Sequence, residues 1–89
     1  MPRAIAEIAN RLGLHARPSA KLTQLATQYR SEVWLEREGR RVNAKSIMGV
    51  MMLAASHGSK ITIETEGEDA EEALSAIIEL IASRFGERE

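Results

Sequence analysis

The feature that most constrains the fold is an alternating strand followed directly by a long amphipathic helix. Residues 60–66, Lys-Ile-Thr-Ile-Glu-Thr-Glu, alternate apolar and polar side chains, as a strand with one buried face does. Asp69 then provides an N-cap, with Glu72 three positions later. The helix that follows carries one apolar stripe, made of Ala70, Ala73, Leu74, Ile77, Ile81 and Phe85. Because this stripe must be buried, we expect the helix to lie flat across a sheet.

The preceding part of the chain divides into shorter elements at its turn signals. We predict strands over 3–9, 31–37 and 40–44, with Glu38-Gly39 as the hairpin turn between the last two. A helix is predicted over 16–28, where Pro18 fits the first turn, and a short one is predicted from Ile47 to Ala54. The resulting order is β-α-β-β-α-β-α.

Composition limits the classes of protein to which the chain can belong. Its 89 residues, 44% of them hydrophobic, suit one compact domain over 1–89. There is no cysteine, and we find neither a signal peptide nor the roughly 20 apolar residues of a membrane span. We therefore expect a cytoplasmic protein with no membrane partner.

Charge and residue types also argue against several ligands. A net charge of -1 and only one Trp, one Tyr and one Phe disfavour nucleic acid, which requires a basic surface and stacking aromatic side chains. His15 and His57 lie far apart, and His57 has no neighbouring arginine or helix start, so we interpret it as a surface residue. We expect no metal site and no cofactor.

The sequence Gly-Leu-His-Ala-Arg-Pro at 13–18 places a histidine at the beginning of the first helix. The first amides of a helix have no intrahelical acceptors, and its dipole adds partial positive charge there, so this end favours an anion. Arg17 can bind two phosphate oxygens at once. We predict that Ala16, Arg17 and Pro18 form a phosphate site beside His15, and that Gly13 keeps the approach to it open.

A neutral imidazole is nucleophilic, and a histidine side chain is mostly neutral near pH 7. A phosphorylated imidazole stays reactive, so His15 suits a phosphoryl carrier, an intermediate in group transfer rather than a stand-alone enzyme. The alternative is that His15 is an ordinary loop residue next to a helix. The glycine, arginine and proline around it favour the anion site.

Two blocks, 13–18 and Ala-Lys-Ser-Ile-Met-Gly-Val at 44–50, resemble the histidine-containing phosphocarrier (HPr) family of the bacterial phosphoenolpyruvate-dependent phosphotransferase system, including its nitrogen-type members. The resemblance implies an α+β fold, an open-faced β-sandwich. In it, a four-stranded antiparallel sheet of order 1-4-2-3 is covered on one side by three helices. It also implies that His15 accepts phosphate on its δ nitrogen from enzyme I and passes it to a IIA component, with Arg17 assisting. Sugar uptake and a regulatory nitrogen branch both stay open.

The same resemblance singles out Ser46 as the family's regulatory serine, which an HPr kinase phosphorylates in some bacteria. Ser46 is explained equally well as the N-cap of the second helix, and both interpretations stay open. Where some family members have a hydrogen-bonding side chain at position 12, this chain has Leu12, so no hydrogen bond from that position can orient His15.

The second helix is apolar almost all round, more than one buried stripe requires. With Val50, Leu53 and Ala54 facing the sheet, we predict a docking surface for partners made of Ile47, Met48 and Met51, ringed by Lys21 and Lys45. Methionines that fill gaps in the core are the alternative, above all at Met52. We expect the protein to be a monomer. A second hypothesis for its function is a regulatory module that binds partners through this surface and Ser46 without phosphotransfer at His15.

Overall fold

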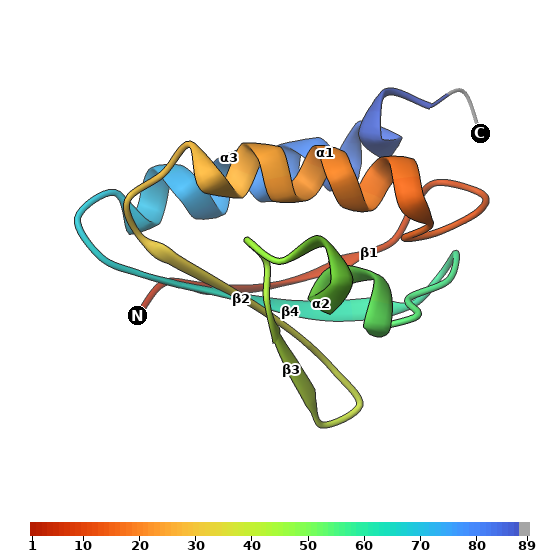
Figure 1. Cartoon of the computed structure of the whole chain (residues 1–89), viewed down its shortest axis with the longest axis horizontal. Coiled ribbons are helices and arrows are strands. Elements are labelled where there is room, and N and C mark those ends of the chain that lie inside the picture. The colour runs from red at the N-terminus through yellow and green to blue at the C-terminus, as the bar shows by residue number, and fades with distance from the viewer. Residues whose placement is uncertain (88–89) are drawn as a thin grey trace.

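The structure is a computed structural model that describes residues 1–87, and Figure 1 shows its helices gathered on one face of a sheet. The elements in chain order are β1 (Arg3–Glu7), α1 (Ala16–Thr27), β2 (Glu32–Arg37), β3 (Arg40–Asn43), α2 (Ile47–Met52), β4 (Lys60–Glu66), α3 (Ala70–Ala82) and the 3-10 turn η1 (Arg84–Gly86). This confirms the predicted order of strands and helices, with element ends shifted by one or two residues at most places.

The sheet has the order β1-β4-β2-β3, and all neighbouring strands are antiparallel, as predicted. The register places Ile63 of β4 beside both Ala4 of β1 and Leu35 of β2. Because side chains alternate along a strand, one face presents Val33, Leu35, Ile61 and Ile63, all buried beneath the helices. The helices leave the other face uncovered, and there the Arg41 guanidinium lies 4.9 Å from the ring centroid of Trp34.

Helices α1 and α3 lie side by side above the sheet (Figure 1). Each buries one stripe: Leu22 and Ala26 from α1, and Ala73, Ile77 and Ile81 from α3. Alternating strands beneath amphipathic helices thus produce one continuous apolar core. No helix within residues 1–87 has the length and apolar character that a membrane crossing requires.

Two sequence predictions about element ends are wrong. Helix α3 stops at Ala82, and Phe85 reaches the core from η1 with a φ of 56°, so the helix does not continue to residue 85. Helix α2 ends at Met52; Ala54 has a φ of 52° and is exposed, and Ala55 is buried in its place. In β1, Ile5 faces away from the helices and is 68% exposed.

Asp69 joins the start of α3 to the segment that leads into β2. It holds the N-cap position, but its carboxylate makes no capping bond to its own helix and instead accepts from the Ser31 hydroxyl, the Ser31 amide (2.9 Å) and the Arg30 amide (3.0 Å). The Ser31 hydroxyl, followed by the Arg30 amide, lowers the pKa of Asp69 from 3.8 to about 2. The ionised carboxylate is therefore the form that the fold stabilises.

An Asp69→Asn variant should unfold at a lower urea concentration than the parent protein at pH 7. Because the folded-state pKa lies below the ordinary value, this contribution is fully present above pH 3.8 and is lost as the pH falls through about 2. The difference in urea midpoint between Asp69→Asn and the parent protein should therefore narrow as the pH falls from 3.8 to about 2. Glu71→Gln, a substitution at an exposed position of α3, is the control. A difference that is the same at pH 2 as at pH 7 would contradict this role of the charge.

Candidate functional site

The loop before α1 is fixed against the segment that follows α2. The Leu14 amide donates to the Ala55 carbonyl at 2.9 Å, and Gly13 is buried with a φ of +68°. A Cβ on Gly13 would lie 2.4 Å from the Ala55 oxygen and 2.7 Å from the Ser56 Cα. The prediction that Gly13 keeps the approach to His15 open is wrong, because this glycine instead permits a close contact between two backbones.

His15 is the N-cap of α1, with an extended backbone (φ −82°, ψ −170°) and a side chain that is 38% exposed. Its carbonyl accepts the first helical hydrogen bond, from Ser19 at 3.0 Å, while its side chain makes no capping bond. The Ala16 and Arg17 amides thus stand at the helix end without intrahelical acceptors, and buried Pro18 has no N–H to offer. At the predicted phosphate site, the amides free to bind an anion are therefore those of Ala16 and Arg17.

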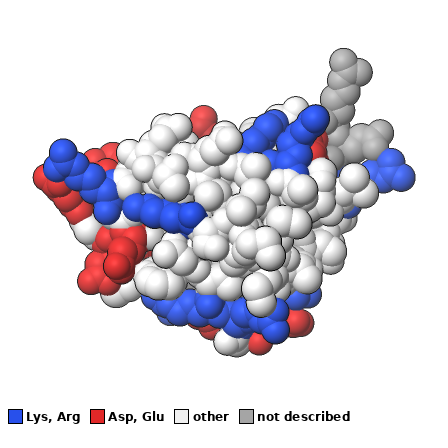
Figure 2. Space-filling model, viewed as in Figure 1, with Lys and Arg blue, Asp and Glu red and all other residues white. Residues whose placement is uncertain are grey.

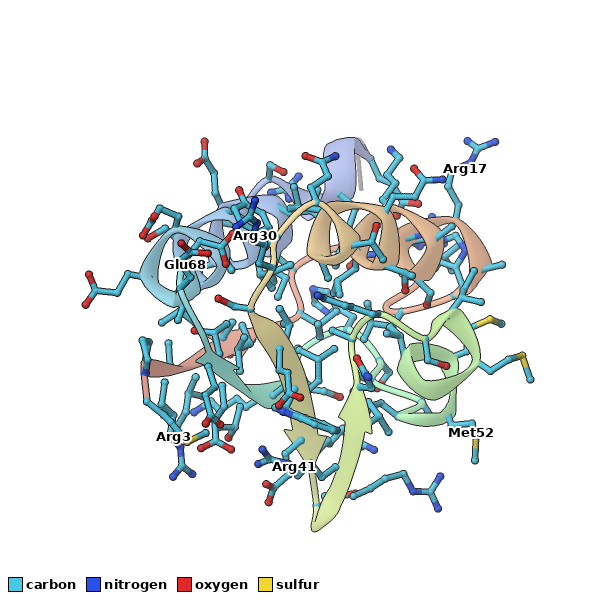
Figure 3. The ribbon with its side chains drawn as sticks, turned by 60° about the vertical axis from the view of Figure 1, so that its left-hand side comes forward. Arg3, Arg17, Arg30, Arg41, Met52 and Glu68 are labelled. Carbon is cyan, nitrogen blue, oxygen red and sulfur yellow. The ribbon has the colours of Figure 1, made fainter. Side chains whose placement is uncertain are left out.

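Arg17 lies on the first turn of α1 and is exposed. Figure 3 shows its side chain extending away from the body of the protein, and among the described residues it makes no hydrogen bond to the His15 ring. Within residues 1–87 its guanidinium has no hydrogen-bond or ion-pair partner. It is accordingly available for an incoming anion without first giving up another contact.

Sequence reasoning missed Glu87, which contacts the His15 ring. The Nε2 atom of His15 lies 3.1 Å from Oε2 of Glu87, across 72 positions of sequence. The other carboxylate oxygen accepts from the Asn10 amide group at 3.0 Å, and that group also donates to the Gly13 carbonyl at 2.8 Å. The one sequence signal that bears on this is Phe85, whose apolar side chain so near the end of the chain indicates an anchored segment.

The two lysines predicted to ring the docking surface both bind main-chain carbonyls. The Lys21 ammonium donates to the Phe85 carbonyl at 2.6 Å, and the Lys45 ammonium donates to the Tyr29 carbonyl at 2.8 Å. Lys21 therefore ties the segment after α3 to α1, and Lys45 ties the segment before α2 to the segment after α1. Each lysine has a structural role, whatever it contributes to steering a partner.

Helix α2 presents an exposed apolar surface, here called the methionine patch and consisting of Ile47, Met48, Met51 and Met52, which are 40%, 66%, 39% and 56% exposed. Exposed Met52 rules out the alternative in which this side chain fills the core. Figure 2 shows that the face over α2 is largely free of charged side chains. Exposed apolar surface of this kind is typical of a protein-binding site.

Ser46 is the N-cap of α2, and its hydroxyl accepts from the Gly49 amide at 3.2 Å. A Ser46→Ala variant should be less stable by about 1 kcal/mol in urea unfolding, since that amide loses its acceptor. Ser75, exposed on α3, provides the matched Ser→Ala control and should change stability by a few tenths of a kcal/mol at most. Equal effects of the two substitutions would argue against the capping role.

Known proteins resemble the chain over nearly its whole length. Residues 3–83 match the family model described as the PTS HPr component phosphorylation site. A phosphocarrier protein HPr from Cupriavidus necator is 63% identical, with 92% of each chain covered, and one from Neisseria meningitidis serogroup A is 57% identical, with 93% of each covered.

Solved structures agree with the sequence relatives. The crystal structure of an HPr from Thermoanaerobacter tengcongensis superposes with a TM-score of 0.96 at 46% identity, covering 100% of both chains. Because the family model matches most of the chain and the relatives cover more than nine tenths of it, the chain belongs to the HPr family, the phosphocarrier proteins of the phosphotransferase system.

Proposed function

We propose that His15 accepts a phosphoryl group on Nδ1 from phosphorylated enzyme I and delivers it to a IIA component. The observation that carries this proposal is the position of His15, a half-exposed imidazole at the N-cap of α1 beside two amides without intrahelical acceptors. The amides at the start of α1 and the positive end of its helix dipole both stabilise the negative charge of a phosphoryl group at this position. Its family membership adds the class of reaction.

Arg17 supplies the formal positive charge of the site. The helix dipole alone contributes about 0.3–1 kcal/mol at an exposed position, which is too little to hold a phosphoryl group by itself. The Arg17 guanidinium, which has no partner among the residues that the structure describes, lies on the same helical turn and can bind two phosphoryl oxygens together. In this proposal it swings towards His15 as the phosphoryl group arrives and releases it as the group leaves.

The methionine patch is the proposed docking surface for both partners. Methionine side chains are flexible and polarisable, so one patch can fit two differently shaped surfaces in turn. Ser46 is exposed at the edge of this patch, directly before Ile47. Phosphorylation of Ser46 by an HPr kinase would add a charge of about −1.5 to −2 there, weakening docking to an acidic partner without altering His15.

The test is to incubate the protein with enzyme I and phosphoenolpyruvate and to measure its intact mass. We expect the mass of one phosphoryl group to be gained, to be lost in mild acid as a phosphoimidazole is, and to disappear on addition of the IIA component. An acid-stable adduct, or a peptide map that places the group outside residues 13–18, would contradict the proposal. A modification at Ser46 would survive the acid step and is thereby distinguished.

A further inference from the structure

We propose that Glu87 is a positioning residue for phosphoryl transfer at His15, because its carboxylate holds the Nε2 proton of the imidazole and leaves Nδ1 as the nucleophile. This inference rests on the proposed function of His15 and adds to it the group that orients the ring. The contact that carries it is the 3.1 Å distance from Nε2 of His15 to Oε2 of Glu87.

The carboxylate selects the tautomer of the ring. A neutral imidazole has one N–H and one nitrogen with a free lone pair, and an ionised carboxylate can only accept hydrogen bonds. The proton of His15 must therefore lie on Nε2, facing Glu87. Within residues 1–87 no other group hydrogen-bonds the ring, so Nδ1 keeps its lone pair for attack on phosphorus.

Glu87 is itself held by a buried amide. Asn10 has no exposed surface, and its amide group donates both to the Gly13 carbonyl, at 2.8 Å, and to Oε1 of Glu87, at 3.0 Å. The buried Asn10 amide therefore orients the Glu87 carboxylate, and this carboxylate orients the His15 imidazole. A reacting histidine oriented through a third group in this way is a recurring arrangement in nucleophilic catalysis.

The segment after α3 is built to bring the carboxylate to this place. Phe85 is 1% exposed in the core, its carbonyl accepts from Lys21 at 2.6 Å, and the Glu87 amide donates to the Arg84 carbonyl at 2.9 Å. Figure 1 shows this segment continuing past the end of α3, where it lies beside the beginning of α1. A loose tail would lose much conformational entropy in making the contact, whereas burial of Phe85 already offsets that loss here.

The position of the charge suits transfer in both directions. When the Nδ1 lone pair attacks, the N–P bond forms, the bond from phosphorus to the donor breaks, and the ring, still protonated on Nε2, becomes positively charged. The Glu87 carboxylate lies against that proton and stabilises the charge. On delivery the N–P bond breaks and the ring returns to its neutral form, so no proton has to move at either step.

This arrangement also explains how the ring is oriented without a hydrogen-bonding side chain at position 12. Leu12 is 69% exposed and has no group that could bond to the imidazole. Among the described residues, Glu87 is the side chain that fixes the ring.

Two measurements test the role of Glu87, using Glu87→Ala, Glu87→Gln and the control Glu71→Gln. The first is the proton NMR signal of the His15 Nε2–H, which a carboxylate acceptor protects from exchange with water. The second is the rate at which phosphoramidate, a small donor that needs no docking surface, phosphorylates His15. In Glu87→Ala we expect the signal to be lost and the rate to fall about tenfold or more, because the nucleophile is no longer held in position. Glu87→Gln should keep an acceptor but not the charge, and so give an intermediate rate.

The proposal is overturned if Glu87→Ala loses the Nε2–H signal but keeps the parent rate, or if it loses rate but keeps the signal. It is also overturned if neither the signal nor the rate changes. Thermal unfolding should show that all three variants keep the fold, because Phe85 and Lys21 are intact in each. Failure of the proposed function looks different. In that case His15 of the parent protein takes no phosphoryl group from enzyme I or from phosphoramidate, while its Nε2–H signal is still lost in Glu87→Ala.

Discussion

A His15→Ala variant is expected to gain no phosphoryl group from enzyme I and phosphoenolpyruvate under conditions that load the parent protein completely. The alanine side chain has no nucleophilic nitrogen with which to form the N–P bond. The backbone amides of α1 can bind a phosphoryl group but cannot accept it covalently. The expected effect is therefore complete loss, measured as intact mass. The fold should persist, since the His15 side chain is half-exposed and makes no capping bond to α1.

The chain offers a matched control in its second histidine. His57 lies exposed in the loop between α2 and β4, as the sequence predicted, and lacks a helix beginning beside it. A His57→Ala variant should accept the phosphoryl group at the parent rate. A normal mass gain in His15→Ala would exclude His15 from the transfer and favour the hypothesis of a regulatory module that works without it.

Local signals in the sequence predicted most of what surrounds His15. The start of α1 follows from a glycine before the histidine and a proline in the first turn, and the cap of α2 follows from Ser46. The alternation of 60–66 matches β4 residue for residue. Each of these features depends on the chemistry of a few neighbouring residues, and such chemistry can be read from sequence.

Features that depend on distant contacts could not be predicted in the same way. Glu87 reaches His15 across 72 positions, and no periodicity or spacing connects the two. The predicted end of α2, at Ala54, was wrong for a similar reason. Its last carbonyls are bound from the β2–β3 hairpin, where Arg37 donates to Leu53 at 3.2 Å and Arg40 donates to Met52 at 2.9 Å. These donors let the helix stop before Ala54 without leaving its carbonyls unpaired.

Gly13→Ala should be the most destabilising of the stability variants considered, by about 2–5 kcal/mol. A left-handed backbone at a residue with a Cβ costs about 1–2 kcal/mol. Overpacking against a neighbour costs about 1–3 kcal/mol more. Both terms apply here, because Gly13 has a φ of +68° and its added Cβ would meet the Ala55 oxygen at 2.4 Å. That oxygen belongs to the backbone, so the clash cannot be relieved by rotating a side chain, and the measurement is the free energy of unfolding in urea.

Gly39→Ala separates the cost of the left-handed backbone from the cost of the clash. Gly39 has a similar φ of +81°, but a Cβ there would have no atom within 4 Å. Gly39→Ala should therefore lose only the backbone share, about 1–2 kcal/mol. Equal losses in the two variants would show that the contact with residues 55–56 contributes nothing. If the contact matters, Gly13→Ala should also slow phosphorylation of the molecules that remain folded. The Gly13 carbonyl holds Asn10, and Asn10 holds Glu87 against His15, so moving the loop moves the nucleophile.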